Sequence, residues 1–331
     1  IRRQRQMCIR DSHNMIEIKQ YNLDDAVKWN EFVSISKQGT FLFNRNYMDY
    51  HADRFADCSF LIMEKGHIVA VLPANREGDT LYSHHGLTYG GLLTTEKITA
   101  EKICNIFSEL NILLKEMGIK QVIYKAIPYI YHRIPAEEDL YALTNICHAQ
   151  LISRDISSSF SLHNVRKFTE SRRSGIRKAI KNGILVGESQ DLAAFWNILN
   201  NNLTTKYNTH PVHSLAELEL LRSRFPKQIK LYLATTTDKE PLGGTLIYET
   251  PNVVHTQYIS ASPKGKAMGT LDLLFDYIIN NVYKGIDGYF DFGKSTEDGG
   301  TILNQQLIHQ KEGFGGRGIC YDTYKWNISV L

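Results

Sequence analysis

The order of the elements predicted from the 331-residue sequence recurs in its two halves, and this recurrence limits the fold more than any single motif. Period-2 and period-3.6 apolar patterns predict a hairpin, a strand, a Gly-containing loop, a long helix, a strand, a helix and a strand in each half. The hairpins are residues 59–73 and 230–249, and the long helices are residues 96–117 and 270–283. We therefore expect two related α/β (α+β) domains joined near residues 150–165.

Residues 1–14 differ in composition from the rest of the chain. They hold four Arg and one Asp, lack the apolar core of a signal peptide, and are expected to be a non-native leader before a start at Met15. Without them the 38 basic and 35 acidic residues become 34 of each, so net charge gives no support for nucleic-acid or membrane binding. We expect the two domains at residues 15–155 and 156–331.

The cysteines and the apolar runs bear on the compartment. The five cysteines are widely spaced and form no CxxC pair, which argues against a disulfide framework or a zinc cluster and for a reducing compartment. No run of about 18 apolar residues exists, so no transmembrane helix is predicted. These features predict a cytoplasmic protein without a membrane span, and they leave its oligomeric state open.

The strand, loop and helix predicted at residues 253–283 form the strongest local candidate for a ligand site. A Gly-containing loop before a helix directs backbone N–H groups at an anion, and the helix dipole adds to this attraction. Lys264 and Lys266 lie in this loop, at residues 263–269, and would supply positive charge to a pyrophosphate. A simple turn with solvated lysines explains the spacing equally well.

A nucleotide-binding pattern occurs at residues 288–295, which read GYFDFGKS and match GxxxxGK[ST]. A real P-loop is a flexible loop between a strand and a helix, whereas here the interior residues YFDF have the composition of a strand. The residues that follow, TEDGG at 296–300, are a poor helix start. We therefore predict a strand at this place and reject a nucleotide-hydrolase function.

Two groups of basic residues are candidates for substrate contacts. Lys311 is on or beside the apolar face of the helix predicted at residues 301–312, where it either points into a site or neutralises the helix C-terminus. Arg173 and Arg177 share one face of the helix predicted at residues 166–182. That face either contacts an anionic substrate or is only solvated.

The histidines give no metal site. Pro211 between His210 and His213 prevents a helical HxxH pair, and no third zinc ligand can be identified. The sequence also has no GxSxG motif and no convincing Ser/His/Asp or Cys/His set. We therefore expect no metal cofactor.

Four segments carry motifs that belong together. They are residues 41–50 (FLFNRNYMDY), 171–183 (SRRSGIRKAIKNG), 290–295 (FDFGKS) and 310–315 (QKEGFG). In combination they resemble FemAB-like proteins of the GNAT acyltransferase superfamily, over Met15 to Trp326. The resemblance implies two tandem GNAT-like domains, each a twisted mixed β-sheet flanked by helices and split near its central strands, with the acyl donor in the second domain.

The resemblance also implies a function. It favours an N-acyltransferase that moves an acyl group from acyl-CoA, such as acetyl-CoA, to a small-molecule amine, for example an amino sugar or a cell-surface glycan precursor. The alternatives are a Fem-like transferase that uses aminoacyl-tRNA and a non-catalytic binding module on a degenerate GNAT fold. The absence of a long heptad stretch disfavours tRNA as partner, while residues 263–269 depart from the GNAT pattern Q/R-x-x-G-x-G/A, which supports the third reading.

Attack of a neutral amine on a thioester needs alignment of the two substrates, donors for the oxyanion, a proton acceptor and an acid for the thiolate. The candidate catalytic residues are Tyr258, Asp291, Lys311 and Tyr321. The residues expected to bind the donor are Ser260, Lys264, Gly265, Lys266, Gly269 and Thr270. The residues expected to bind the acceptor are Arg173, Arg177, Tyr207 and His213.

Overall fold

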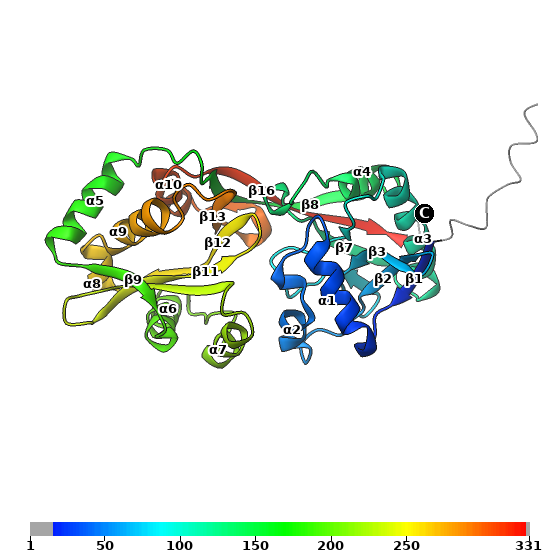
Figure 1. The fold of residues 1–331 in the computed structure, drawn as a ribbon, viewed down its shortest axis with the longest axis horizontal. Helices are drawn as coiled ribbons and strands as arrows, with labels where there is room; N and C mark the ends of the chain where they lie inside the picture. Colours follow the sequence, from blue (N-terminus) through cyan, green and yellow to red (C-terminus); the bar gives the residue numbers. More distant parts are fainter. Residues whose placement is uncertain (1–15, 329–331) are drawn as a thin grey trace, which may run out of the picture. The chain divides into compact units, whose positions relative to one another are not determined.

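The computed structural model describes residues 16–328, apart from the side chain of Tyr207. The expected leader and the start at Met15 lie outside these residues. The chain forms two compact units (Figure 1). Within the described residues, unit 1 comprises residues 16–129, 134–152 and 323–328, and unit 2 comprises residues 130–133 and 153–322.

The joint expected near residues 150–165 is not a linker, because most of it forms a twelve-residue strand, β8 (Gln150–Ser161). Its sequence, QLISRDISSSFS, has few apolar residues, so it lacks the apolar pattern by which strands are recognised. The contiguous domains 15–155 and 156–331 stay a prediction. The units defined by contacts exchange two short segments, residues 130–133 and 323–328.

Unit 1 contains an antiparallel sheet in the order β1-β2-β3-β6. Its strands are β1 (Ile16–Gln20), β2 (Phe60–Glu64), β3 (His67–Leu72) and β6 (Leu93–Thr94). The predicted hairpin is confirmed as β2 and β3. Lys65 and Gly66 between them both have positive φ, 51° and 80°, as a two-residue turn of this kind requires.

The other strands of unit 1 follow the order β4-β5-β7-β16. They are β4 (Asn75–Glu77), β5 (Thr80–Tyr82), β7 (Gln121–Lys125) and the second half of β16 (Arg317–Asn327). The helices are α1 (Ala26–Ile35), α2 (Arg45–Met48), α3 (Ala100–Glu116) and α4 (Glu138–Asn145). The predicted apolar face of α3 is buried in the core of this unit, which confirms the helix predicted at residues 96–117.

Unit 2 is built on strands in the order β16-β8-β13-β12-β11-β10-β9. The further strands are β9 (Leu185–Ser189), β10 (Ile229–Thr235), β11 (Pro241–Glu249), β12 (Val253–Ala261) and β13 (Tyr289–Lys294). A small hairpin, β14 (Thr296–Glu297) with β15 (Ile302–Leu303), follows β13. The P-loop pattern at residues 288–295 thus contains the strand β13, and the next element is the strand β14 and not a helix. The prediction that this segment is not a P-loop is confirmed.

Helices cover both faces of this sheet. They are α5 (Glu170–Lys181), α6 (Leu192–Tyr207), α7 (Leu215–Arg224), α8 (Pro263–Ala267), α9 (Thr270–Tyr277) and α10 (Gln305–Gly313). A π-helical turn at Ile278–Val282 extends α9. Short 3-10 turns lie at Leu23–Asp25, Phe41–Phe43, Asp49–His51, Tyr129–Tyr131 and Asp298–Gly300. Figure 1 shows α6 and α7 on one face and α5 and α9 on the other.

The crossing of α5 and α9 depends on glycine. Gly269, directly before α9, has φ +76°, and a Cβ on it would lie 2.4 Å from the carbonyl oxygen of Gly175 in α5. A Cβ on Gly175 would in turn lie 1.8 Å from Asp272 Oδ2. The two helices therefore approach more closely than larger residues would allow, and α5 brings Arg172 against the start of α9.

The loop expected at residues 263–269 is largely helical, because Pro263–Ala267 form α8. Ser262 caps this turn through its hydroxyl, and Pro263 occupies the first helical position, where a missing N–H is harmless. Backbone N–H groups of Lys266, Met268 and Gly269 donate to carbonyls within the turn. The prediction that this segment presents a row of free backbone N–H groups to an anion is therefore wrong.

Candidate functional site

The site lies where two parallel strands part. β12 and β13 pair only over Val253–His255 with Tyr289–Asp291. Beyond these residues β12 continues to Ala261 and β13 to Lys294 without further pairing between them in the described sheet. The ends of the two strands thus leave room between them. The predicted split between central strands is found in unit 2.

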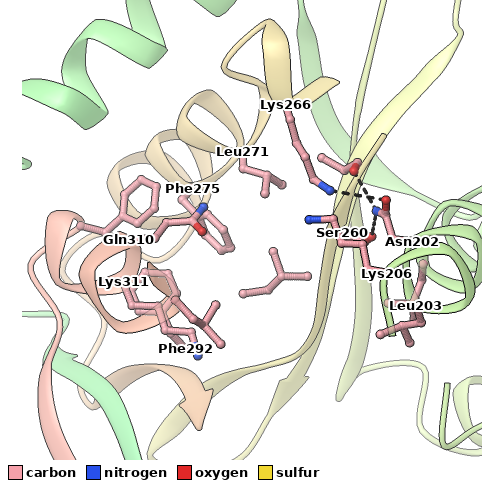
Figure 2. Close-up of a pocket in the computed structure, with 15 residues that line it drawn as sticks. Asn202, Leu203, Lys206, Ser260, Lys266, Leu271, Phe275, Phe292, Gln310 and Lys311 are labelled. Atoms are coloured by element: carbon pink, nitrogen blue, oxygen red, sulfur yellow. Dashed lines mark hydrogen bonds between the residues drawn. The ribbon is translucent and has the colours of Figure 1, made fainter. Parts of the chain in front are cut away.

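A cavity of about 230 Å³ occupies this opening (Figure 2). Apolar side chains make up much of its wall, among them Leu271 and Phe275 of α9 and Phe292 of β13. Its polar residues are Asn202, Lys206, Ser260, Lys266, Gln310 and Lys311. None of the described residues that line it is acidic, so the cavity presents three lysines to an apolar space and favours an anionic ligand with an apolar portion.

A second, more polar hollow of about 400 Å³ shares Lys266, Leu271 and Gln310 with the first. Its other lining residues, around the start of α9, are Arg172, Gly269, Thr270, Asp272, Gln306 and His309, and the Asp272 carboxylate is paired with Arg172. The Thr270 hydroxyl is buried and has no hydrogen-bond partner among the described residues. A buried hydroxyl without a partner is costly, so a bound acceptor group at this helix start would satisfy it.

Lys266 stands at the junction of the two hollows. Its Nζ lies 3.4 Å from Asn202 Oδ1 (Figure 2). Burial lowers the pKa of Lys266, and the nearby charge of Lys206 lowers it further. Two lysines that repel each other beside an apolar cavity gain stability when an anion binds between them.

The other predicted donor residues have different roles. Lys264 points to Glu240, with which it forms an exposed ion pair, and it lines neither hollow. Gly265 is buried, and a Cβ on it would lie 2.2 Å from the carbonyl oxygen of Leu242. The structure therefore brings Ser260, Lys266, Gly269 and Thr270 to the hollows but not Lys264, and it gives Gly265 a packing role.

A buried polar cluster surrounds Asp291, which is fully buried in β13. Its Oδ2 lies 2.8 Å from His255 Nδ1 and accepts a hydrogen bond of 2.8 Å from the Tyr321 hydroxyl. The Ser157 hydroxyl donates to Oδ1. The Tyr131 hydroxyl lies 3.0 Å from that of Tyr321 and 3.3 Å from His255 Nδ1. Asp291 and Tyr321, both predicted from sequence, are therefore in direct contact.

The charge state of Asp291 follows from these contacts. Burial raises the pKa of the carboxyl group, but the hydrogen bond and charge of His255 and the hydrogen bonds of Ser157 and Tyr321 outweigh it. The net result holds the pKa of Asp291 below its ordinary value of 3.8. The group is a carboxylate at neutral pH, and each of its oxygens accepts hydrogen bonds.

Lys311 connects the cavity to this cluster. It is 4% exposed, lines the cavity, and its Nζ donates hydrogen bonds of 2.8 Å to the carbonyl oxygens of Gly293 and Lys294. Burial lowers its pKa from 10.5 to about 8, although the charge of Asp291 opposes this shift. Of the two sequence interpretations, a lysine that points into a site fits the position of this side chain.

A β-bulge places three polar residues of β12 on one face. The pairing with β11 passes from Ile247–Thr256 to Leu246–Tyr258, so Gln257 has no partner on β11 in the described sheet. His255, Tyr258 and Ser260 pair with alternate residues of β11 and therefore point the same way, towards α6. Because the regular ladder is interrupted here, the backbone N–H of Gln257 is a candidate donor to an oxyanion.

Tyr258 and His213 meet on this face, with the Tyr258 hydroxyl 2.6 Å from His213 Nδ1. Burial raises the pKa of Tyr258 to about 12, so its hydroxyl is protonated at neutral pH and can donate. The sequence predicted both residues for different roles. The structure brings them together, apart from the cluster around Asp291.

The predicted acceptor residues of α5 do not reach either hollow. Arg173 and Arg177 both form ion pairs with Glu170 on their own helix. Arg172, which the sequence interpretation passed over, lines the second hollow and donates to Asp272 Oδ1 at 2.6 Å. The spacing of basic residues along the sequence had pointed to Arg173 and Arg177, which we call the outer basic row of α5. The side chain of Tyr207 lies outside the described residues.

Among the residues of the site that were missed at the sequence level are Tyr131, Ser157, Arg172, Lys206 and His255. His255 left a usable signal, since the strands predicted at residues 253–260 and 288–293 place it and Asp291 at matching positions. Tyr131 and Ser157 left none, because they lie in segments that were predicted as loop or linker.

The sequence of unit 2 matches a known protein family. Residues 166–298 match the family described as Acetyltransferase (GNAT) domain. Unit 2 contains a GNAT domain. Among solved structures, FemX matches with TM-score 0.65 and 10% identity over 94% of this chain and 97% of that one. The tandem FemAB-like GNAT fold predicted from the motifs is thereby confirmed: each unit combines parallel and antiparallel strand pairs, with β5 parallel to β7 and β12 parallel to β13, and helices flank the strands.

Two further structures of the same fold are similar to this chain. L-PGS from Bacillus licheniformis matches with TM-score 0.61 and 11% identity over 92% of this chain and 91% of that one. A tandem GNAT protein from the clavulanic acid biosynthesis pathway matches with TM-score 0.52 and 10% identity over 95% and 99%. No curated protein matches the sequence. These comparisons support an acyltransferase fold and leave the substrates to the site.

The described residues contain neither a candidate membrane span nor a candidate metal-binding group. No helix among residues 16–328 has the length and apolar character needed to cross a bilayer. Within the same range, no group of three or more His, Cys, Asp and Glu side chains is arranged to hold a metal ion.

Proposed function

We propose that the protein is an N-acyltransferase that takes an acyl group from acyl-CoA in unit 2 and passes it to an amine. The observation that carries the proposal is the pair of joined hollows at the parted ends of β12 and β13. The cationic hollow at the start of α9 suits the phosphates of CoA. The apolar cavity suits its thioester arm, and Lys311 lies in the wall of that cavity.

The chemistry uses Lys311 in the cavity wall and two residues of β12, Gln257 and Tyr258. These two residues directly precede Ile259 and Ser260 of the wall along the chain. The amine nitrogen attacks the thioester carbonyl, and negative charge develops on the carbonyl oxygen. The backbone N–H at the bulge and the Lys311 ammonium are the proposed donors to that charge. The C–S bond then breaks, and Tyr258, which is protonated at neutral pH, can donate a proton to the thiolate.

Calorimetric titration with CoA and acetyl-CoA tests the donor. We expect binding of both, because the phosphates and the thioester arm have separate contacts in the two hollows. Absence of binding by either compound at millimolar concentration would refute an acyl-CoA donor. Release of free thiol from acetyl-CoA with a panel of amines then separates an enzyme from a binding module.

Replacing Lys266 with Ala is expected to raise the dissociation constant for CoA by about tenfold, which corresponds to about 1.4 kcal/mol of lost binding energy. Lys266 lies at the junction of the two hollows, whereas Lys264, two residues earlier, pairs with Glu240 on the surface. Lys264→Ala is therefore the matched control and should leave the constant unchanged. Equal effects of both variants would indicate non-specific electrostatic attraction only.

The acceptor is proposed more coarsely. An amino sugar or a cell-surface glycan precursor follows from the resemblance alone, and a panel of amino sugars, sugar nucleotides and amino acids would test it. A cytoplasmic location is proposed with it, because acyl-CoA is a cytoplasmic donor. Labelled acetyl-CoA incubated with a cell extract would show which compounds receive the acyl group.

An aminoacyl-tRNA donor is the second candidate. It follows from the FemAB-like resemblance, and the higher TM-scores of FemX and L-PGS compared with the tandem GNAT protein favour it. Under this proposal the outer basic row of α5 contacts the tRNA. The double variant Arg173→Glu/Arg177→Glu should then abolish tRNA binding in a gel-shift assay, while absence of binding by the wild-type protein would exclude this donor.

A further inference from the structure

The pair formed by His255 and Asp291 is not needed to hold the donor in either hollow. His255 is in β12, where the pairing with β13 ends, and Asp291 is its direct neighbour across the two strands. Neither residue lines the cavity or the second hollow. The histidine side chain is 11% exposed, whereas the aspartate side chain is fully buried. A buried carboxylate hydrogen-bonded to an imidazole whose edge stays accessible has the form of a proton acceptor with its orienting group.

The contacts of Asp291 determine which imidazole nitrogen carries the proton. A carboxylate only accepts hydrogen bonds, so the 2.8 Å contact requires a proton on Nδ1 of His255. The hydroxyls of Ser157 and Tyr321 also donate to Asp291 and fix its orientation. In the neutral ring the lone pair is then on Nε2, and the carboxylate opposite stabilises the imidazolium that forms when Nε2 takes a proton.

The position of Gly293 gives the ring space beside the cavity. A Cβ on Gly293 would lie 3.4 Å from His255 Cε1 and 3.9 Å from Nε2, so the missing side chain leaves this edge of the ring uncovered. The carbonyl oxygen of the same glycine accepts a hydrogen bond from Lys311. His255 and Lys311 therefore approach the same residue of β13, and Lys311 lines the cavity.

The bulge in β12 places His255 on the same face as the other polar groups. His255, Tyr258 and Ser260 point the same way because Gln257 is passed over in the pairing. Ser260 lines the cavity, and Gln257, at the bulge, is the proposed backbone donor to the acyl oxygen. The imidazole thus lies two residues before the proposed oxyanion donor, on the face where a polar acceptor can approach.

We propose that His255 is the general base of the transfer and that Asp291 is its positioning residue. The inference rests on the proposed N-acyl transfer. As the amine nitrogen forms its bond to the acyl carbon, its proton passes to Nε2 of His255. The C–S bond breaks with its electron pair on sulfur, and the thiolate takes the proton held by the imidazolium, directly or through Tyr258. Amide and free thiol then leave, both side chains are back in their starting protonation states, and no other reactant is required.

The first test reads the ring and not the activity. Nitrogen NMR of the full chain with labelled histidine should show His255 with a proton on Nδ1 and a lone pair on Nε2. His255→Gln assigns the signal, and Asp291→Asn should shift the ring towards the other tautomer. His163, which pairs with Asp287 on the surface, is the matched control, and its signal should not change in Asp291→Asn. A wild-type ring with its proton on Nε2 would overturn the proposal.

The second test separates catalysis from binding. His255→Ala should lower kcat with acetyl-CoA and an amine acceptor by roughly 10²–10⁴-fold and leave the dissociation constant of acetyl-CoA unchanged, because general base catalysis contributes about that factor. Added imidazole should restore part of the rate, and His163→Ala should behave as wild type. A His255→Ala enzyme with full kcat would sink this inference but not the proposed function. Failure of the wild-type protein to bind acetyl-CoA would refute the proposed function. The NMR measurement would still show which nitrogen of His255 carries the proton opposite Asp291.

Discussion

Lys311→Met is expected to lower kcat for acyl transfer by roughly 10²–10³-fold, the loss found when one donor to a developing oxyanion is removed. The ammonium donates to the carbonyl oxygens of Gly293 and Lys294 and so keeps one N–H for a molecule in the cavity. Methionine preserves the length and the apolar stem of the side chain. The loss should therefore appear in kcat more than in the dissociation constant of the donor.

The lowered pKa of Lys311 predicts the direction in which the rate of acyl transfer changes with pH. Because burial lowers its pKa to about 8, the ammonium is the main form at neutral pH and disappears as pH rises through 8. The rate should fall over the same interval, and a rate that rises through it would identify Lys311 as a base instead. The folded pKa lies below the unfolded one, so between about 8 and 10.5 the unfolded chain binds more protons and stability rises with pH.

The control for this variant is Lys284→Met. Lys284 is an exposed lysine of the same unit, outside both hollows, so its replacement changes net charge by the same amount without touching the cavity. Its kcat and its pH profile should match those of the wild-type protein. A similar loss in both variants would point to a general effect of charge and not to the ammonium in the cavity.

Asp291→Ala is expected to destabilise unit 2 measurably, because each buried polar group left without a partner costs roughly 1–3 kcal/mol. The change leaves His255 Nδ1 and the hydroxyls of Ser157 and Tyr321 buried without their common acceptor. Hydrogen exchange followed by mass spectrometry measures the effect locally, because amides of β12 and β13 should exchange faster. This local measurement avoids a two-state assumption for a chain of two units.

The matched control is Asp287→Ala. Asp287 also pairs with a histidine, His163, but its side chain is 97% exposed, so its loss should leave the exchange of β12 and β13 unchanged. The direction in which the stability of unit 2 changes with pH follows from the lowered pKa of Asp291. Its stabilisation is present above the ordinary value of 3.8 and is lost as pH falls through the lower folded value. Stability of unit 2 that is unchanged in Asp291→Ala would contradict the role given to the cluster.

Long-range pairing explains the parts of the site that could not be predicted from the sequence. Tyr131 and Asp291 are 160 residues apart along the chain, and Ser157 and Asp291 are 134 apart, yet all three meet in one buried cluster. No local periodicity records such a meeting. The bulge at Gln257 is similar, because it depends on the pairing of β12 with β11 and reverses which residues share a face.

The strand, loop and helix predicted at residues 253–283 were the strongest local candidate for the site, and β12, α9 and β13 occur where apolar spacing indicates them. The helix predicted at residues 301–312 begins later, as α10, because Ile302–Leu303 form a strand. Pro263 and the Ser262 cap start a helical turn whose N–H groups are used internally. The proposed anion site therefore lies at the start of α9, at the predicted residues Gly269 and Thr270, and not at Lys264.

The sequence by itself determined the tandem α/β plan and the strand character of residues 289–294, and it singled out Lys311, Asp291 and Tyr321 as candidate site residues. These features depend on spacing and composition within short windows. Only the tertiary structure decided that Arg172 and not Arg173 reaches a hollow, that Lys264 faces Glu240, and that His255 faces Asp291. The reason is physical: local patterns specify which face of an element is apolar, whereas the partner of each polar side chain depends on which distant strand or helix packs beside it.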